Sequence, residues 1–326
     1  MFAAKLVAPK TFEIVEMPPP DIETAPPGSI IVRTRRATTC GSDMPYFLGT
    51  YPEARFMASE AFPAHECVGE VVATTSPHFH VGDTVMAQPD HFTGLGQFYL
   101  ARDKHTTLIP ADGDWNRWVM CQPLGTVIWG FRHLGTLFHQ NVLILGQGGI
   151  GLFCTQMAAC LGARNIVVVD PIEHRRSVGL ATGATHAFGA ADDAELAAAV
   201  QAVVGRSGVD TVIEAVGHQT ATLNTAIRLV KHGGTILAFG VPDVAVYPVN
   251  YNELFRKNVH LVTTVTSPDY PKEFELAVEY IRRGLIDVRP FITHEFPFSQ
   301  VAAAYELFAS RRDNVIKVMI NYDTPQ

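Results

Sequence analysis

The chain has 326 residues, of which 47% are hydrophobic and 17% charged, and its formal net charge is -7. This length allows two domains with sizeable cores, and the acidic balance argues against nucleic acid as the main partner. No apolar run reaches the roughly twenty residues that span a bilayer, and Met1–Lys5 lacks the apolar core of a signal peptide. The five cysteines, an odd number, do not suggest a disulfide framework. We therefore expect a soluble, cytoplasmic protein with no membrane partner.

Residues 1 to about 120 have the pattern of a β-rich unit. Short apolar stretches at Ile30–Arg33 and Cys67–Val72 are typical of strands. The proline and glycine clusters at Pro18–Pro20 and Pro26–Gly28 predict loops between such strands.

From about Pro123 the pattern changes to alternating helices and strands, which is typical of a doubly wound α/β domain with a parallel sheet. The expected strands are Val142–Leu145, Ile166–Val169, Thr211–Ile213, Thr235–Phe239 and Val259–Val262. The expected helices are Leu152–Leu161, Asp193–Val204, Ala221–Val230 and Glu273–Arg283. Beyond about Asp287 the pattern is β-like again at Phe291–Phe298 and Val315–Asn321, so this last segment is a candidate to return to the first domain.

A glycine-rich turn, Gly146–Gly151, has the sequence G-x-G-x-x-G and lies between an expected strand and an expected helix. The next expected strand ends at Asp170. Strand, glycine turn, helix, strand and acid within about thirty residues form the context that makes this motif a dinucleotide-binding fingerprint. Gly146 permits the tight turn, Gly148 lets backbone N–H groups approach a pyrophosphate at the helix N-terminus, and Gly151 lets the helix pack closely on the strand.

Asp170 indicates which dinucleotide is bound. Its carboxylate can accept hydrogen bonds from both hydroxyls of the NAD ribose, whereas it would repel the 2′-phosphate of NADP. NAD is therefore favoured over NADP. Arg175 and Arg176 follow on the next helix and either soften this preference or serve only as solvated charges.

A second constellation lies in the first domain, where Cys40 is followed by Gly-Ser-Asp and His65 is followed by Glu66. A thiolate, an imidazole and a carboxylate are good zinc ligands, and a catalytic zinc keeps one position open. Each residue alone also has an ordinary structural explanation. Cys40 can be a small buried apolar residue, His65 a hydrogen-bonded loop residue, and Glu66 an exposed acid.

The combination of motifs resembles the zinc-containing medium-chain dehydrogenase/reductase family, with the polyol and threonine dehydrogenase branches nearest. The resemblance covers nearly the whole chain and rests on Cys40–Asp43, His65–Gly69, Gly82–Val85, Gly146–Gly151, Glu214–Gly217, Gly233–Ile236, Phe239–Gly240 and Ile292–Pro297. It implies a GroES-like β-barrel catalytic domain, split in sequence around a Rossmann domain. The expected boundaries are 1–122 for the first part of the catalytic domain, 123–287 for the NAD-binding domain and 288–326 for the return.

The resemblance also implies roles for single residues. Cys40 and His65 match zinc ligands, and Glu66 matches the acid that binds the metal directly or through water. Ser42 matches the hydroxyl that relays the substrate proton, and Asp43 matches a carboxylate that orients the ligand histidine. Further residues are assigned to the substrate (Tyr46), to the nicotinamide (Thr126) and to other parts of the cofactor (Gly149, Ile150, Val216 and Gly240).

Two departures from the family pattern concern zinc. Gln122 stands where polyol branches carry glutamate and alcohol dehydrogenases carry a ligand cysteine. The neighbouring Cys121 points about 100° away on a helix, so Gln122 is kept as a weak candidate ligand. The segment Met86–Phe98 lacks the four cysteines that bind a structural zinc in many relatives, so one catalytic zinc and no structural zinc are expected.

The resemblance therefore implies an NAD-dependent zinc oxidoreductase that interconverts a secondary alcohol and its ketone. The partners expected are a small alcohol or ketone and further copies of the chain, as a homodimer or homotetramer. Two alternatives stay open. One is a zinc-free enone or quinone reductase of the same superfamily, and the other is a non-catalytic NAD-binding relative.

Overall fold

The computed structural model describes residues 1–326 except 51–59, 190–191, 265–266, 268–269 and 324–326. The chain forms two compact units. The first unit contains Met1–Gly125, Pro268–Arg282 and Val288–Gln326, and the second contains Thr126–Ser267 and Arg283–Asp287. The division places 268–282 with the first unit, whereas the sequence-based boundaries 1–122, 123–287 and 288–326 stay a prediction.

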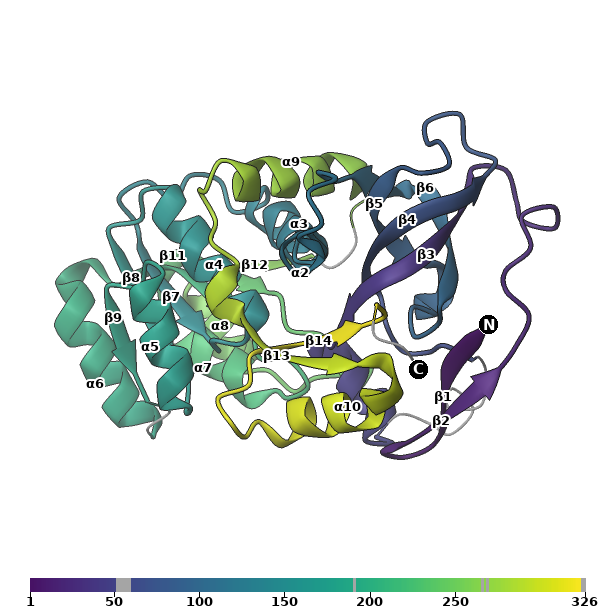
Figure 1. Cartoon of the computed structure of the whole chain (residues 1–326). Coiled ribbons are helices and arrows are strands. Elements are labelled where there is room, and N and C mark those ends of the chain that lie inside the picture. Colours follow the sequence, from purple (N-terminus) through teal and green to yellow (C-terminus); the bar gives the residue numbers. More distant parts are fainter. Residues whose placement is uncertain (51–59, 190–191, 265–266, 268–269, 324–326) are drawn as a thin grey trace. The chain divides into compact units, whose positions relative to one another are not determined.

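Six strands of the first unit form one sheet in the order β13-β14-β3-β4-β5-β6, and β3 also pairs with β6, which closes β3 to β6 into a barrel (Figure 1). A separate antiparallel hairpin, β1 with β2, precedes it in the chain. The strands are β1 Phe2–Ala8, β2 Thr11–Glu16, β3 Ser29–Thr38, β4 Glu66–Thr74, β5 Thr84–Pro89, β6 Phe98–Leu108, β13 Ile292–Pro297 and β14 Lys317–Asn321. Strand β14 of the C-terminal segment pairs with β3, and Val288–Gln326 belongs to the first unit.

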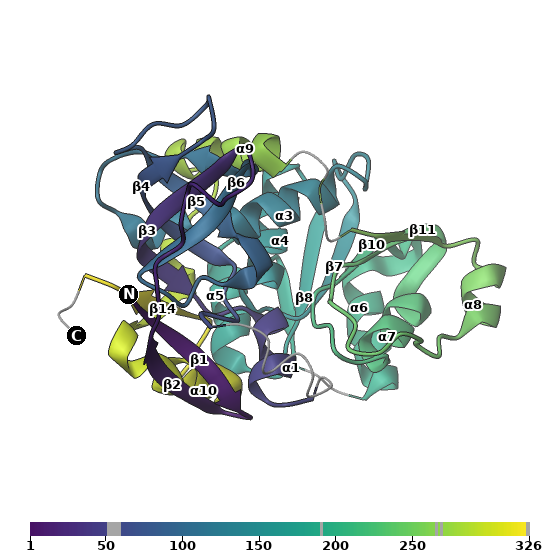
Figure 2. The same cartoon turned by 90° about the vertical axis from the view of Figure 1, so that its right-hand side faces the viewer.

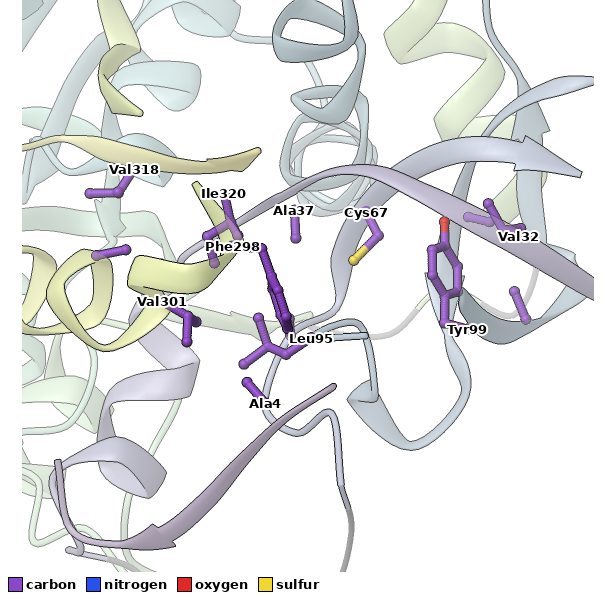
Figure 3. Close-up of a cluster of buried hydrophobic side chains, with 14 of the residues drawn as sticks. Ala4, Val32, Ala37, Cys67, Leu95, Tyr99, Phe298, Val301, Val318 and Ile320 are labelled. Carbon is purple, nitrogen blue, oxygen red and sulfur yellow. The ribbon is translucent and has the colours of Figure 1, made fainter. Parts of the chain in front are cut away.

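An apolar core of the first unit includes residues of the barrel strands and of the C-terminal segment. Figure 3 shows Phe298, Val301, Val318 and Ile320 of the C-terminal segment directed toward the same core as Ala37 and Cys67. Burial of these side chains fixes the C-terminal segment in this unit. The helices of the first unit are α1 Met44–Phe47, α2 Trp115–Val119, α9 Tyr270–Arg282 and α10 Val301–Ser310, while α3 Cys121–Phe131 contains residues of both units.

The second unit contains a parallel sheet with the strand order β12-β11-β10-β7-β8-β9, which is the doubly wound order. Figure 2 shows β11, β10, β7 and β8 side by side in this order. Its strands are β7 Asn141–Leu145, β8 Asn165–Val169, β9 His186–Phe188, β10 Val209–Glu214, β11 Val230–Ala238 and β12 His260–Thr263. Its helices are α4 Gly149–Cys160, α5 Glu173–Ala181, α6 Asp193–Val204, α7 Ala221–Leu229 and α8 Tyr251–Arg256. The expected fold class is confirmed.

Helices cover both faces of this sheet. One face of the sheet, with Leu143 and Val167, shares a core with Leu196 of α6 and Ile227 of α7. Because side chains alternate along a strand, Val168 faces the other way, and it lies against Gly179 of α5. The chain order reverses between β7 and β10, and ligands of such sheets bind at the carboxyl ends of the strands at this point.

Some element bounds differ from the prediction. Val230 begins β11 and does not end the preceding helix, and α4 begins at Gly149 and not at Leu152. Strand β9 was not expected from the sequence. All five cysteines are free thiols. Within the described residues, no helix combines the length and apolarity needed to cross a membrane.

Candidate active site

Cys40, His65 and Glu66 lie together in the first unit, and one ligand atom from each falls within 4.8 Å of the others. The pairing of β3 with β4 explains this arrangement. Thr38 at the end of β3 is the partner of Glu66 at the start of β4, so Cys40 and His65 extend from adjacent strand ends. The structure therefore brings together the three residues that the sequence proposed as metal donors.

Asp43 holds two members of this donor set in place. Its Oδ2 accepts a hydrogen bond from the Cys40 backbone N–H at 2.9 Å, and its Oδ1 lies 3.3 Å from His65 Nδ1. With Nδ1 facing the carboxylate, Nε2 of His65 is left for a metal, which is the usual arrangement of a ligand histidine. Tyr305 of α10 supports Asp43 in turn, because its hydroxyl donates to Oδ2 at 3.2 Å.

The surroundings of the donor set are electronegative. Burial alone would lower the pKa of His65, but the negative charges of Cys40 and Asp43 outweigh it and raise that pKa well above its ordinary value. The same field that stabilises a proton on His65 stabilises a divalent cation. A thiolate, an imidazole and a carboxylate also suit zinc chemically, so the residues present fit the metal.

Ser42 and Tyr46 lie on the short helical segments that follow Cys40. The Ser42 hydroxyl donates to Cys40 Sγ at 3.2 Å, so it is adjacent to the donor set. The Tyr46 ring packs edge-on against Phe62, with 4.7 Å between ring centroids. The roles of both residues toward a substrate stay predictions.

Lys317 contacts Glu66 of this site, although it was not predicted from the sequence. Its Nζ pairs with Glu66 Oε2, donates to Thr38 Oγ1 at 3.2 Å and donates to the Thr39 carbonyl at 2.9 Å. Glu66 is 1% exposed and Lys317 is 3% exposed. Burial opposes the charge on Lys317, but the carboxylate of Glu66 raises its pKa above the ordinary value. The sequence does hold one indication of this role, because Lys317 lies within the apolar run Ile316–Ile320. A lysine that is buried with such a run requires a partner of opposite charge.

Gln122 and two further cysteines of the first unit differ in their surroundings. Gln122 is 4% exposed on α3, and its role as a fourth ligand stays a prediction. Cys67 and Cys121 are fully buried, and burial raises the pKa of both thiols. These two thiols therefore stay protonated, unlike a metal-bound cysteine.

The glycine turn of the second unit has the geometry that its sequence predicts. Gly146 has a φ of +92°, and a Cβ on Gly151 would lie 1.9 Å from the Gly146 carbonyl oxygen. A Cβ on Gly148 would meet only Arg175 Nη1, at 4.0 Å, so this side of the turn is open. Helix α4 begins at Gly149, which Ile150 follows, and no side chain among the described residues caps its N-terminus. Such an end is suited to a phosphate group.

Asp170 stabilises the turn from the next strand. Its Oδ2 accepts the Gln147 N–H and its Oδ1 accepts the Ile172 N–H, both at 2.8 Å. Each carboxylate oxygen has a second lone pair, so Asp170 can still accept from a ribose. Arg176 donates to the Asp170 carbonyl at 2.7 Å, which assigns it a structural contact.

The loops after β10 and β11 border the same turn. A Cβ on Gly146 would lie 2.9 Å from Val216 Cγ2, and one on Gly240 would lie 2.2 Å from the Gly217 nitrogen. Glu214 fixes this region, because its Oε1 accepts from the Val216 N–H at 2.9 Å. Gly146, Val216 and Gly240 thus meet at the carboxyl edge of the sheet, whereas the role of Thr126 on α3 stays a prediction.

Family models and relatives agree with this geometry. Residues 26–133 match the alcohol dehydrogenase GroES-like domain, and residues 149–283 match the zinc-binding dehydrogenase model. L-idonate 5-dehydrogenase of Vitis vinifera is 30% identical over 98% of this chain and 94% of that enzyme. Sorbitol dehydrogenase of Arabidopsis thaliana is 28% identical over 98% and 94% of the two chains.

A solved structure has the same fold. Alcohol dehydrogenase TADH from Thermus sp. ATN1 superposes with a TM-score of 0.83 over 98% of this chain and 99% of that chain, at 22% identity. The identity and coverage of the curated relatives, together with the two matched models, establish the family. The chain is an oxidoreductase of the zinc-containing medium-chain dehydrogenase/reductase (alcohol dehydrogenase) family, in its polyol dehydrogenase-like branch.

Proposed function

We propose that this protein uses NAD to interconvert a secondary alcohol, either a polyol or an amino or hydroxy alcohol, and its ketone. The donor set of Cys40, His65 and Glu66, with Asp43 against His65, carries the proposal. The relatives named L-idonate 5-dehydrogenase and sorbitol dehydrogenase support the polyol class. A zinc-free enone or quinone reductase needs no such donor set, so the donor set argues against that alternative.

In the proposed reaction Cys40, His65 and Glu66 would hold one catalytic zinc, with Gln122 as a further candidate ligand. When bound, zinc supplies a Lewis acid that lowers the pKa of an alcohol. The hydroxyl of Ser42 accepts the alcohol proton and passes it toward solvent, and Tyr46 contacts the substrate. When bound, NAD would supply the hydride acceptor for the alcohol carbon, and Thr126 would contact its nicotinamide.

The proposed NAD site is the carboxyl edge of the second unit's sheet. Backbone N–H groups of Gly148, Gly149 and Ile150 face the pyrophosphate, and the guanidinium of Arg175 adds positive charge beside Gly148. Asp170 accepts from the ribose hydroxyls, while Val216 and Gly240 border the cofactor. The proposed domains are 1–122 with 288–326 for catalysis and 123–287 for NAD.

Metal analysis combined with a substrate panel tests this function. We expect about one zinc per chain in purified protein and NAD reduction with at least one polyol, amino alcohol or simple alcohol. Turnover by protein that has been stripped of metal would favour the zinc-free reductase. NAD binding without reduction by any alcohol of the panel would favour a non-catalytic relative.

Asp170→Asn is expected to lower the preference for NAD over NADP by about 10- to 100-fold, because it removes the charge that binds the ribose hydroxyls and repels a 2′-phosphate. The measurement is kcat/KM for each cofactor with one alcohol. Asp192→Asn is the control, since Asp192 also accepts two backbone N–H groups, from Ala194 and Glu195. An unchanged cofactor ratio in the Asp170 variant would remove Asp170 from the proposed NAD site.

We also propose that the protein assembles as a homodimer or homotetramer. Strand β12 is an edge of the parallel sheet, and Leu261 on it is 42% exposed. Tyr251 and Phe255 of α8, in the same unit, are 67% and 66% exposed. An unpaired apolar edge is suited to pairing with a second copy. Leu261→Asp is expected to shift the mass measured by light scattering from the oligomer to the monomer, and a monomeric wild type would contradict the proposal.

The cytoplasmic location predicted from the sequence is likewise kept as a proposal. The five free thiols support it, because thiols persist in a reducing compartment.

A further inference from the structure

A short turn in the first unit, Asp90–Phe92, has an unusual backbone. His91 has φ 54° and ψ 20°, and Phe92 has φ 60°. Two consecutive residues with side chains therefore adopt the left-handed region that favours glycine. Such conformations persist only where the surrounding structure imposes them, and they are concentrated at functional sites.

Several contacts impose this conformation. The Phe92 carbonyl accepts the Ala64 N–H at 2.8 Å, and the Ala64 carbonyl accepts the Gly94 N–H at 3.0 Å. Arg102 Nε donates to Asp90 Oδ2 at 2.8 Å at the start of the turn. Gly94 permits the close approach, since a Cβ there would lie 2.4 Å from Cys67 Sγ. The turn is thus fixed to the segment that carries His65.

This arrangement places Phe92 on the ring of the proposed ligand His65. The ring centroids are 5.0 Å apart, with an interplanar angle of 53°. Phe92 is 39% exposed, so burial of its ring accounts poorly for the strain of the turn. Nδ1 of His65 lies 3.3 Å from Asp43 Oδ1, and His65 offers one ligand atom to the donor set. Phe92 therefore packs against a proposed metal ligand while part of its surface stays exposed.

We infer that Phe92 is the apolar wall that binds the hydrocarbon part of the substrate, and that the strained turn holds it in position. This inference rests on the proposed function and adds a substrate property to it. The carbon chain next to the reacting carbon presents C–H groups, and no ionic group, to Phe92. Each methylene that a ligand buries is worth about fourfold in affinity, so ligands with a longer chain bind more tightly.

Two amides test the inference without requiring turnover, because an amide carbonyl resembles a ketone but does not accept a hydride. The probes are acetamide and hexanamide, and their affinity for the enzyme loaded with zinc and NADH is measured by calorimetry. Hexanamide is expected to bind wild type more tightly than acetamide. Phe92→Ala is expected to weaken hexanamide about 10-fold and acetamide less than about threefold, whereas Phe92→Leu keeps most of the hexanamide affinity.

A matched control is available in the second unit. Phe138 is 74% exposed, its ring lies 6.3 Å from that of His139, and His139 also has a left-handed φ of 62°. Phe138→Ala is expected to leave the affinity for both amides unchanged. Zinc affinity, measured by competition with a chelator, and the thermal midpoint are expected to be the same for Phe92→Ala as for wild type.

Each outcome of this experiment decides one question. Equal weakening of both amides, or no weakening, overturns the role of Phe92 while alcohol oxidation continues to support the proposed function. A wild type that oxidises alcohols but does not distinguish the two amides also overturns the inference. A wild type that neither binds amides nor oxidises alcohols contradicts the proposed function itself.

Discussion

Cys40→Ala is expected to remove the bound metal and to lower kcat/KM by about a thousandfold or more. Cys40 supplies the only thiol in the donor set of Cys40, His65 and Glu66, so the two remaining donors bind a divalent cation poorly. Loss of the Lewis acid removes several kcal/mol of transition-state stabilisation, which corresponds to about this decrease in rate. Elemental analysis and steady-state kinetics with the best alcohol of the panel measure both effects.

NADH binding separates this loss from a loss of folding. The glycine turn at Gly146–Gly151 belongs to the other compact unit, so the NADH dissociation constant of the Cys40 variant is expected to change less than about twofold. Cys160→Ala is the control, because Cys160 is an exposed thiol of the second unit and is expected to leave metal and turnover unchanged. Turnover that persists in Cys40→Ala with no bound metal would exclude a zinc mechanism.

The local motifs of the fold and site could be predicted because the residues that determine each motif lie close together in the sequence. The glycine turn needs a positive φ at Gly146 and a close approach at Gly151, and both requirements are met in the structure. Cys40 and His65 could be paired only through the family resemblance. The register of Thr38 with Glu66 then supplies the physical reason why they meet.

Other parts of the site depend on contacts between distant segments. Lys317 reaches Glu66 across 251 residues, because β14 pairs with β3 and β3 pairs with β4. Tyr305 reaches Asp43 across 262 residues through the packing of α10. No local pattern reports a strand order or a packing angle, so these supporting residues were not predicted. The stretch near His91 could be predicted as a loop that lines the pocket. The left-handed backbone at Phe92 could not, since such backbone is expected at glycine and not at phenylalanine.

Lys317→Met is expected to lower the free energy of unfolding of the metal-free protein by about 3–5 kcal/mol, the cost of breaking a buried ion pair by removing one partner. The carboxylate of Glu66, 1% exposed, would keep its contact with Thr38 but would lose its cationic partner. Urea unfolding in excess chelator measures this change. Chelation is necessary because bound metal would itself stabilise the folded state.

A double-mutant cycle shows whether this loss comes from the pair. Glu66→Gln combined with Lys317→Met removes both charges, so the double variant is expected to be more stable than Lys317→Met alone. Lys231→Met is the matched control. Lys231 pairs with Asp210 in the second unit, but its side chain is 40% exposed, so its loss is expected to cost at most about 1 kcal/mol. Equal destabilisation by the two lysine variants would show that the buried Lys317–Glu66 pair contributes no more to stability than the exposed Lys231–Asp210 pair. In that case Lys317 would serve the site only through its contacts with Thr38 and Thr39.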